Sequence, residues 1–301
     1  MADPSISLDG KVAVITGGGR GIGRAMALGY IRAGAAGVVI TAASSANELK
    51  EAEAEAGAAG GPNRCFGLLA DVTNWRDCEK VVGETLRRFG RLDILVNNAA
   101  KGPRYMSDEI GPFWKADPDG WRLIVDTNFN GPFYMARAAV PQMIDRRWGR
   151  IINVSKTTES MYQAATSPEG PSKAALSTAT LCWAQDLLET GITVNCVGPG
   201  GGTDTKFEPE SRRGPARASG RLMSPDVMTP ISIWLASERS NGVTGCRYTA
   251  RLWDSSLPPD EAAELCRETP IFKKPVARPV RLTKTWQESR LGDLLHNQQP
   301  K

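Results

Sequence analysis

A glycine-rich loop near the N-terminus places the strongest constraint on how this chain can fold. The apolar run Lys11–Thr16 predicts a buried strand, the glycines of residues 17–23 follow it directly, and a helical stretch begins at about Gly21. Glycine lets the backbone approach a diphosphate closely, and the free N–H groups of a helix N-terminus bind the anion. A glycine turn without a ligand is the competing interpretation. The strand before it and the helix after it favour a nucleotide-binding βα unit.

The alternation of strand and helix continues along the chain. Short β-branched runs predict strands, and longer stretches with apolar residues at helical spacing predict the helices between them. The expected strands cover residues 11–16, 37–41, 65–70, 92–96, 150–154, 192–197 and 243–250. The expected helices cover about 21–33, 47–56, 75–89, 121–146, 172–189, 227–236 and 259–266. Such alternation requires right-handed βαβ crossovers. The sequence therefore predicts an α/β fold, a doubly wound, parallel, seven-stranded sheet with helices on both faces.

The expected sheet domain spans residues 5–253, and neither a repeat nor a linker divides it. Residues 254–301 form a Pro-rich C-terminal extension of irregular structure, in which prolines interrupt any long helix. These prolines are Pro258, Pro259, Pro270, Pro275 and Pro279. We expect the extension to cover the domain or a neighbouring subunit, with a free tail as the alternative.

Composition excludes several classes of protein. Of 301 residues, 41% are apolar and 23% charged, which is typical of a globular chain, and the net charge of +4 is too small to indicate a nucleic-acid partner. Neither a signal peptide nor an apolar run of the roughly 18 residues that a membrane helix needs is visible. Six isolated cysteines and one histidine argue against a metal site and a disulfide framework. We expect a soluble, cytoplasmic enzyme without metal, nucleic-acid or membrane partners.

A series of motifs follows the glycine loop in order. The series is T-G-x-x-x-G-I-G at Thr16–Gly23, Asp71-Val72, Asn97-Asn98-Ala99, Trp121 with D-T-N-x-x-G around Asn128, Arg150–Ser155, Ser172-Lys173-Ala174-Ala175, and Pro199-Gly200. In this order, over about 250 residues, the chain resembles the short-chain dehydrogenase/reductase family. The resemblance implies a Rossmann-type domain, a nicotinamide dinucleotide, hydride transfer on a small-molecule substrate, and a homodimer or homotetramer.

The resemblance also implies a set of cofactor contacts, position by position. The set comprises Gly17, Arg20, Gly21, Ile22 and Gly23 at the pyrophosphate, Asp71 and Val72 at the adenine, Asn98 and Ala99 at the ribose, Lys173 at the nicotinamide ribose, and Pro199, Gly200 and one of Thr203 or Thr205 at the carboxamide. Gly201 and Gly202 leave the register of the last contact open.

The end of the second expected strand bears on the choice of dinucleotide. NAD-selective sheets place Asp or Glu there to bind the ribose 2′-hydroxyl, but residues 39–45 contain no carboxylate. A 2′-phosphate requires donors and positive charge, which Arg20, Ser44 and Ser45 can supply. We therefore expect NADP(H) rather than NAD(H). The alternative is that Arg20 is a solvated loop residue that does not bind the cofactor.

The catalytic positions depart from the family pattern. Family members carry Asn, Ser, Tyr and Lys, with the acid/base Tyr four residues before Lys. Asn128 and Lys173 match, whereas Glu169 stands in the Tyr position and Lys156 in the Ser position. The four candidate catalytic residues are therefore Asn128, Lys156, Glu169 and Lys173.

Charge determines what the two replacements can do. Glu169 lies four residues before Lys173, a spacing that suits a helical ion pair, and a nearby cation favours the carboxylate. A carboxylate accepts protons, which suits alcohol oxidation or proton abstraction beside a carbonyl, whereas burial would favour an acid that donates. Lys156 can polarise a substrate oxygen, or pair with Glu169 so that each quenches the other.

These residues are compatible with three functions. The first is NADP(H)-dependent hydride transfer, with Glu169 handling the proton and Lys156 polarising the oxygen, while Lys173 and Asn128 hold cofactor and proton path. The second is a lyase or isomerase that uses Glu169 as its base, and the third is a catalytically silent nucleotide-binding protein. Tyr162 is a rival acid, and the hydroxyls of Ser155, Thr157 and Thr158 are substitutes for the missing one.

Two segments should shape the substrate pocket. Residues 101–121 carry aromatic and apolar side chains, namely Tyr105, Met106, Phe113 and Trp114, which predict an apolar or aromatic substrate face. Residues 203–222 form an expected lid with a basic bias, which suits an anionic substrate or an ordinary solvated surface.

Overall fold

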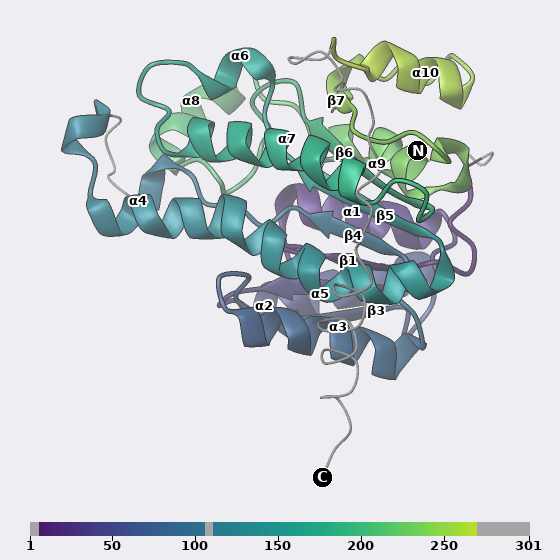
Figure 1. Cartoon of the computed structure of the whole chain (residues 1–301). Helices are drawn as coiled ribbons and strands as arrows, with labels where there is room; N and C mark the ends of the chain where they lie inside the picture. Colours follow the sequence, from purple (N-terminus) through teal and green to yellow (C-terminus); the bar gives the residue numbers. More distant parts are fainter. Residues whose placement is uncertain (1–5, 106–110, 270–301) are drawn as a thin grey trace.

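The strands pair in one parallel sheet of seven strands, in the order β3-β2-β1-β4-β5-β6-β7 (Figure 1). The computed structural model describes residues 6–105 and 111–269. The strands are β1 (Val12–Ile15), β2 (Gly37–Ala42), β3 (Cys65–Leu69), β4 (Ile94–Asn97), β5 (Gly149–Val154), β6 (Ile192–Gly198) and β7 (Arg247–Thr249). Strand order reverses between β1 and β4, and such a switch point opens a crevice at the carboxyl ends of the strands. The predicted α/β fold is confirmed.

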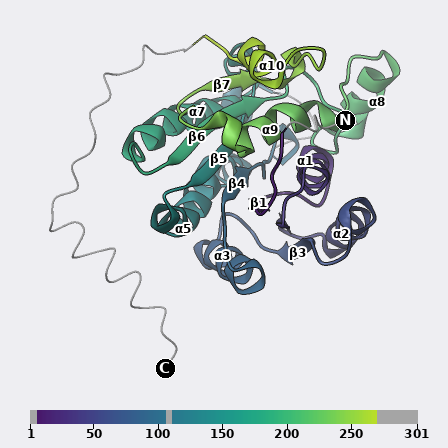
Figure 2. The same cartoon turned by 90° about the vertical axis from the view of Figure 1, so that its right-hand side faces the viewer.

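Helices cover both faces of the sheet. They are α1 (Gly21–Arg32), α2 (Ala46–Gly60), α3 (Trp75–Phe89), α4 (Pro118–Val125), α5 (Gly131–Arg146), α6 (Thr158–Met161), α7 (Glu169–Asp186), α8 (Glu210–Ala218), α9 (Thr229–Ala236) and α10 (Pro259–Cys266). Figure 2 shows α1 and α2 on one side of the strands and α3, α5 and α7 on the other. None of the helices in the described ranges combines the length and the apolar character needed to cross a membrane.

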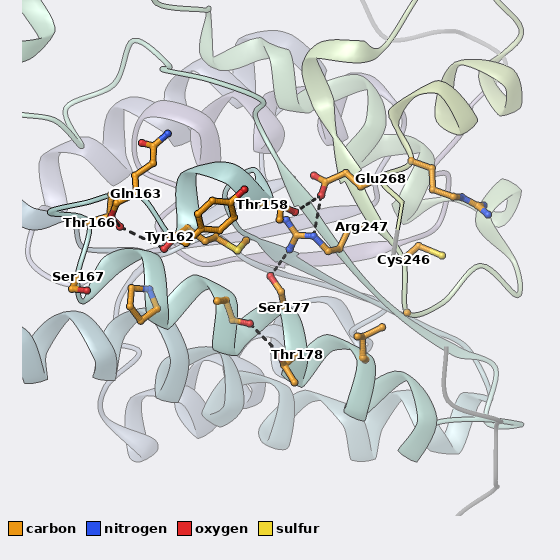
Figure 3. Close-up of a pocket in the computed structure, with 16 residues that line it drawn as sticks. Thr158, Tyr162, Gln163, Thr166, Ser167, Ser177, Thr178, Cys246, Arg247 and Glu268 are labelled. Atoms are coloured by element: carbon orange, nitrogen blue, oxygen red, sulfur yellow. Dashed lines mark hydrogen bonds and ion pairs between the residues drawn. The ribbon is translucent and has the colours of Figure 1, made fainter. Parts of the chain in front are cut away.

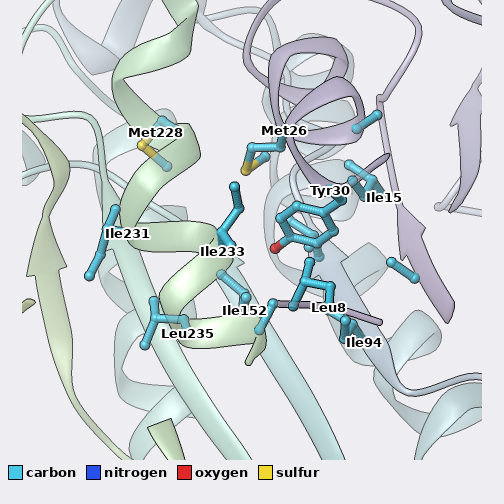
Figure 4. Close-up of a cluster of buried hydrophobic side chains, with 14 of the residues drawn as sticks. Leu8, Ile15, Met26, Tyr30, Ile94, Ile152, Met228, Ile231, Ile233 and Leu235 are labelled. Atoms are coloured by element: carbon cyan, nitrogen blue, oxygen red, sulfur yellow. The ribbon is translucent and has the colours of Figure 1, made fainter. Parts of the chain in front are cut away.

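Two apolar clusters hold these layers together. On one face, Met26 and Tyr30 of α1 meet Ile231 and Ile233 of α9 over the buried strands (Figure 4). On the other, residues of α3 and α5 pack against the opposite side of the same strands. Because the central strands are buried on both faces, they consist of continuous Val and Ile runs instead of an alternating pattern.

The helix expected over 121–146 is interrupted. A π-helical turn, Asp126–Asn130, separates α4 from α5. The wider turn contains Asn128, whose buried side chain bonds to the backbone of Lys101 and to Ser172 Oγ. Insertions of this kind occur often where a helix supplies a functional side chain.

The strand expected over 243–250 is shorter than predicted. Only Arg247–Thr249 pairs as β7. Just before this strand, the side chain of Asn195 forms hydrogen bonds with main-chain groups of residues 243 and 246. Asn195 Nδ2 donates to the Val243 carbonyl at 2.7 Å, and its Oδ1 accepts from the Cys246 N–H at 3.0 Å. A buried amide thus replaces ladder hydrogen bonds that the sequence pattern favoured.

The helix expected over 259–266 has the predicted bounds, as α10. Its Ala262, Ala263 and Cys266 are buried, and Asp260 accepts from Trp234 Nε1 and pairs with Arg239. This part of the C-terminal region therefore packs on α9. Pro270, Pro275 and Pro279 lie outside the described residues.

Candidate active site

A cavity of about 970 Å³ opens at the carboxyl ends of the strands. Every residue that the sequence analysis predicted to bind the cofactor lines this cavity. These residues are Gly17, Arg20, Gly21, Ile22, Gly23, Ser44, Asp71, Val72, Asn98, Ala99, Lys173, Pro199, Gly200 and Thr203. Segments up to 186 residues apart in sequence (17 to 203) thus converge at the switch point of the sheet, where this architecture places ligands.

The glycine loop is a cradle that admits no side-chain carbons. Gly17 has φ of +65°, and a Cβ there would lie 3.0 Å from the Ala99 Cα. A Cβ at Gly23 would lie 2.4 Å from the Gly17 carbonyl oxygen. Asn98 Nδ2 fixes the loop by donating to the carbonyls of Thr16 and Gly17, at 2.8 and 3.1 Å. The loop leads into the N-terminus of α1, so its shape and dipole suit a pyrophosphate.

The opposite end of the cavity carries the residues nominated for a 2′-phosphate. Arg20 lies beside the N-terminus of α2, where Ser45 Oγ accepts from the Glu48 N–H at 3.4 Å. Arg20 Nη1 contacts Glu48 Oε1 at 3.3 Å, and Lys206 Nζ contacts the same oxygen at 3.5 Å. Glu48 is therefore the carboxylate that currently occupies the basic end of the cavity. The S-x-x-E pattern at 45–48, a capping box, is the sequence signal that placed it there.

A free hydroxyl lies at the end of the cavity that the sequence predicts for the nicotinamide. Thr203 Oγ1 is buried and has no partner among the described residues. Thr205 Oγ1, in contrast, accepts from the Phe207 N–H at 3.3 Å. A carboxamide would satisfy the unpartnered Thr203, so the residues present fit a dinucleotide here, with Thr203 as the better candidate of the two.

Lys156 and Glu169 form an ion pair inside the cavity. Glu169 begins α7 and its side chain is 6% exposed, and its Oε1 lies 2.9 Å from Lys156 Nζ. Lys156 follows the carboxyl end of β5. The prediction of a helical ion pair between Glu169 and Lys173 is wrong, and the alternative prediction of a pair between Lys156 and Glu169 is confirmed. Lys173 reaches back toward the sheet, where its Nζ donates to the Val154 carbonyl at 2.8 Å, and the carboxylate pairs with Lys156 instead.

Lys173 is a buried cation whose charge is only partly compensated. Burial lowers the pKa of its ammonium group to about 8, against the opposing effect of the nearby Glu169 carboxylate. The proximity of Lys156 lowers the pKa further. Lys173 is thus close to titration at physiological pH, which suits a residue that holds a ribose and relays a proton.

Asn128 lies behind the cavity wall instead of in it. Its Oδ1 accepts from the Lys101 N–H at 2.8 Å, and its Nδ2 donates to the Lys101 carbonyl at 2.9 Å and to Ser172 Oγ at 3.1 Å. The amide therefore fixes the backbone of Lys101, which does line the cavity.

The rival hydroxyls have different environments. Tyr162 is 72% exposed and lines a second cavity, to which residues of α6 also contribute (Figure 3). Ser155 Oγ donates to the Lys173 carbonyl at 3.2 Å, and Thr158 Oγ1 donates to Glu268 Oε2 at 3.1 Å. Thr157 faces the main cavity but donates to Ser160 Oγ at 3.0 Å. Thr157 and Ser160 thus line the main cavity and bond to each other, not to α7 or the C-terminal region.

The substrate side is less aromatic than the sequence suggested. Tyr105 lines the cavity, whereas Phe113 and Trp114 stack edge to face on the exterior, 64% and 72% exposed. Met106 lies outside the described residues. Lys101, Arg104, Phe207 and Glu208 also line the cavity, within the two segments expected to shape it, whereas sequence reasoning missed Gln163. Lys101 stands two residues after Ala99 of the Asn97–Ala99 motif, but periodicity gives no signal for the path of Gln163.

The lid segment contains α8, and its charges are largely paired. Asp204 and Glu210 bind Arg217, and Glu208 binds Arg212. The sequence indicated only a broken, basic loop, because Gly214 and Pro215 interrupt the helical pattern. Ion pairs between Asp204 and the helix hold the segment together instead.

Comparison with known proteins identifies the fold family. The family model for short chain dehydrogenases matches residues 11–216. This chain belongs to that family. A short chain dehydrogenase/reductase of Aspergillus oryzae is 34% identical to the chain over 255 residues, covering 81% of this chain and 94% of that protein. L-fucose dehydrogenase of Bos taurus is 31% identical over 242 residues, covering 76% and 84%.

Solved structures agree with this assignment. A putative short-chain alcohol dehydrogenase from Sinorhizobium meliloti 1021 matches with a TM-score of 0.73 and 29% identity, over 82% of this chain and 97% of that chain. The predicted family is confirmed. Membership supports a dehydrogenase or reductase that uses a nicotinamide cofactor and acts on a small molecule.

Proposed function

We propose that this protein is an NADP(H)-dependent oxidoreductase that transfers a hydride between nicotinamide and a carbonyl, alcohol or imine carbon of a small substrate. One observation carries the choice of NADP(H). The end of β2, Ala42-Ala43-Ser44, has no carboxylate for a ribose 2′-hydroxyl, and Arg20 and Lys206 converge beside the N-terminus of α2. Two cations and a helix N-terminus favour a phosphate dianion. Glu48 holds both cations until a stronger anion displaces it.

The acid/base chemistry is assigned to the Lys156–Glu169 pair. When bound, the nicotinamide accepts or gives the hydride. In the oxidative direction, the substrate O–H bond breaks as its proton passes to the Glu169 carboxylate, and the hydride leaves the adjacent carbon. Lys156 stabilises the developing negative charge on the substrate oxygen. The reductive direction reverses each transfer, with Glu169 then acting as the acid.

The ion pair itself explains how two opposite charges serve this role. At 2.9 Å, each group neutralises the other in the free protein, so neither is buried as an isolated charge. A substrate oxygen placed beside the pair can contact both groups. Lys173 binds the nicotinamide ribose, and Asn128 keeps Lys101 in place on the facing wall.

Titration with NADPH and NADH tests the proposal. Nicotinamide fluorescence, with energy transfer from the protein's eight tryptophans, reports binding. NADPH should bind at least tenfold more tightly than NADH, about 1.4 kcal/mol. A panel of carbonyl and alcohol substrates then checks turnover by cofactor absorbance. Absence of binding by either dinucleotide would overturn the proposal.

Two other outcomes would redirect the assignment. Product formed without any net change in cofactor absorbance would identify a lyase or isomerase that uses Glu169 as its base. Tight NADPH binding without turnover across the panel would identify a catalytically silent nucleotide-binding protein.

The proposal also covers domain organisation, assembly and location. The catalytic domain spans residues 5–253 with a lid at 203–222, and a C-terminal extension spans 254–301. The protein is a homodimer or homotetramer in the cytoplasm. All six cysteines are free thiols, which supports a reducing compartment. Light scattering after size exclusion measures the oligomeric state.

A further inference from the structure

A buried arginine lies behind the candidate active site, outside the cofactor cavity. Arg247 on β7 is 7% exposed and lines the second cavity (Figure 3). Its Nη2 donates to the Lys156 carbonyl at 2.7 Å, its Nη1 donates to Ser177 Oγ, and its Nε donates to Glu268 Oε2 at 3.1 Å. The guanidinium fork therefore joins β7, α7, the C-terminal region and the backbone of a candidate catalytic residue.

Glu268, which is half-buried, completes this network. Its Oε2 accepts from Thr158 Oγ1 at 3.1 Å and its Oε1 from Thr249 Oγ1 at 2.8 Å, in addition to the Arg247 contact. The Arg247–Glu268 pair thus holds both ends of the short segment Lys156–Thr158, at Lys156 through a carbonyl and at Thr158 through a hydroxyl. A hydrogen-bonded pair with this many satisfied partners is rigid.

The opposite side of the same segment is also closed. A Cβ at Gly198 would lie 3.0 Å from the Lys156 carbonyl carbon, so β6 leaves no room for that backbone to retreat. Ser177, which Arg247 contacts, donates to the Lys173 carbonyl at 2.8 Å and lies 3.3 Å from Ser155 Oγ. One network thereby sets the relative positions of the strand end after β5 and of α7, which carry Lys156 and Glu169.

We propose that Arg247, buttressed by Glu268, is a positioning residue that fixes where the Lys156 ammonium meets the Glu169 carboxylate. It touches neither cofactor nor substrate and acts through the Lys156 backbone. Its consequence for turnover rests on the proposed function, but the position of Lys156 is measurable without any reaction.

The test follows the acetylation rate of Lys156 by peptide mass spectrometry. In the full chain, the ion pair and burial protect this amine, which is 24% exposed. Arg247→Ala should acetylate at Lys156 at least about fivefold faster, since a charged hydrogen bond that orders its backbone is lost. Lys11, which pairs with Glu238 away from the site, is the internal reference and should not change.

Arg267→Ala is the matched control. Arg267 lines the same cavity, but its guanidinium pairs with Glu264 on α10 and lies apart from the hydrogen bonds that hold the Lys156–Thr158 segment. Because the Arg267 side chain pairs with Glu264 and not with Arg247, its replacement should leave Lys156 labelling unchanged. Glu268→Gln, which keeps the side-chain shape, should give a smaller increase than Arg247→Ala and serves as the test variant if Arg247→Ala does not fold.

Chemical rescue distinguishes the loss of the Arg247 hydrogen bonds from a general loss of packing in the variant. Because Arg247 borders a cavity of about 610 Å³, methylguanidinium can reach the vacated place. It should restore slow labelling of Lys156 in Arg247→Ala, whereas methylammonium should not. Unchanged labelling in a folded variant, or a rise that methylguanidinium fails to reverse, would overturn the proposal. NADPH titration of the same proteins reports on the proposed function separately, so either idea can fail alone.

Discussion

The two ends of the main cavity are built by different means. At the dinucleotide end, the glycine loop and the start of α1 form the site from backbone, and its geometry tolerates no added atoms at Gly17 or Gly23. At the reaction end, the site consists of side-chain charges on Lys156, Glu169 and Lys173. A shape made from backbone must be kept intact, whereas a charge arrangement can be rebuilt with other residue types. On the proposed function, this explains how one cavity combines the glycine-loop motif of the family with Lys156 and Glu169 at the predicted catalytic positions.

Adding one carbon to the backbone-built end should have the largest effect. In Gly23→Ala, the new Cβ would lie 2.4 Å from the Gly17 carbonyl and 2.9 Å from the Gly18 Cα, so the loop must move. NADPH affinity should fall at least about 100-fold, or 2.7 kcal/mol, measured by fluorescence titration. Gly57→Ala is the control, with open space around its Cβ in the last turn of α2, and should leave binding unchanged while stabilising the fold by about 0.5–1 kcal/mol. Affinity within threefold for Gly23→Ala would contradict the comparison.

Removing the buried cation should alter the pH dependence of stability. The pKa of Lys173 is lowered to about 8 by burial, from 10.5 for a free lysine. Between these values the unfolded chain binds the proton and the folded chain does not, so wild-type stability rises with pH in that window. Lys173→Met, which lacks the titration, should be the more stable protein at pH 7. Its advantage should shrink by up to about 1.4 kcal/mol per pH unit between pH 8 and 10.

Urea unfolding of both proteins at pH 7, 8 and 10 measures this difference. A gap that stays constant over the range would show that Lys173 is not held as a destabilised cation.

The basic end of the cavity should distinguish the two dinucleotides. Arg20→Ala removes a charged donor near the α2 N-terminus, and NADPH affinity should fall about tenfold while NADH affinity stays the same. Fluorescence titration with both cofactors gives the ratio. An equal loss for both would mean that Arg20 contacts the pyrophosphate only, and the NADP(H) assignment would lose its main support.

The smallest effect is expected at Glu48, which competes for the same cations. Glu48→Gln releases Arg20 and Lys206, which are 43% and 64% exposed, so the ion pairs are weak. NADPH affinity should rise about threefold, the opposite direction from Arg20→Ala. Weaker NADPH binding by this variant would show that Glu48 supports the site instead of occupying it.

The sequence predicted the sheet well because its signals are local. Buried strands are apolar runs, and the glycine loop marks a backbone conformation that only glycine tolerates. Where prediction failed, tertiary contacts were responsible. The Asn195 side chain bonds to the main chain just before β7, where the sequence predicts more strand. A π-helical turn that contains Asn128 interrupts a segment that the sequence predicts as one continuous helix.

The reaction end shows the same limit more sharply. The i, i+4 spacing favoured an ion pair between Glu169 and Lys173. Only the path of the chain after β5 shows that the Lys156 side chain reaches Glu169 instead, and the sequence does not give that path. Arg247 carries no motif, and its role depends on four segments that meet only in the folded chain. Pocket-lining positions were predictable where a family motif existed, and Gln163 was not, because no pattern spans 158–168.

The most direct test of the account compares Glu169→Gln with the wild type on the first substrate that the wild type turns over. The amide has the shape of the carboxylate but cannot take the proton. NADPH affinity should stay within about twofold, while turnover falls at least about 100-fold. Unchanged turnover would remove Glu169 from the mechanism and place the proton chemistry elsewhere in the cavity.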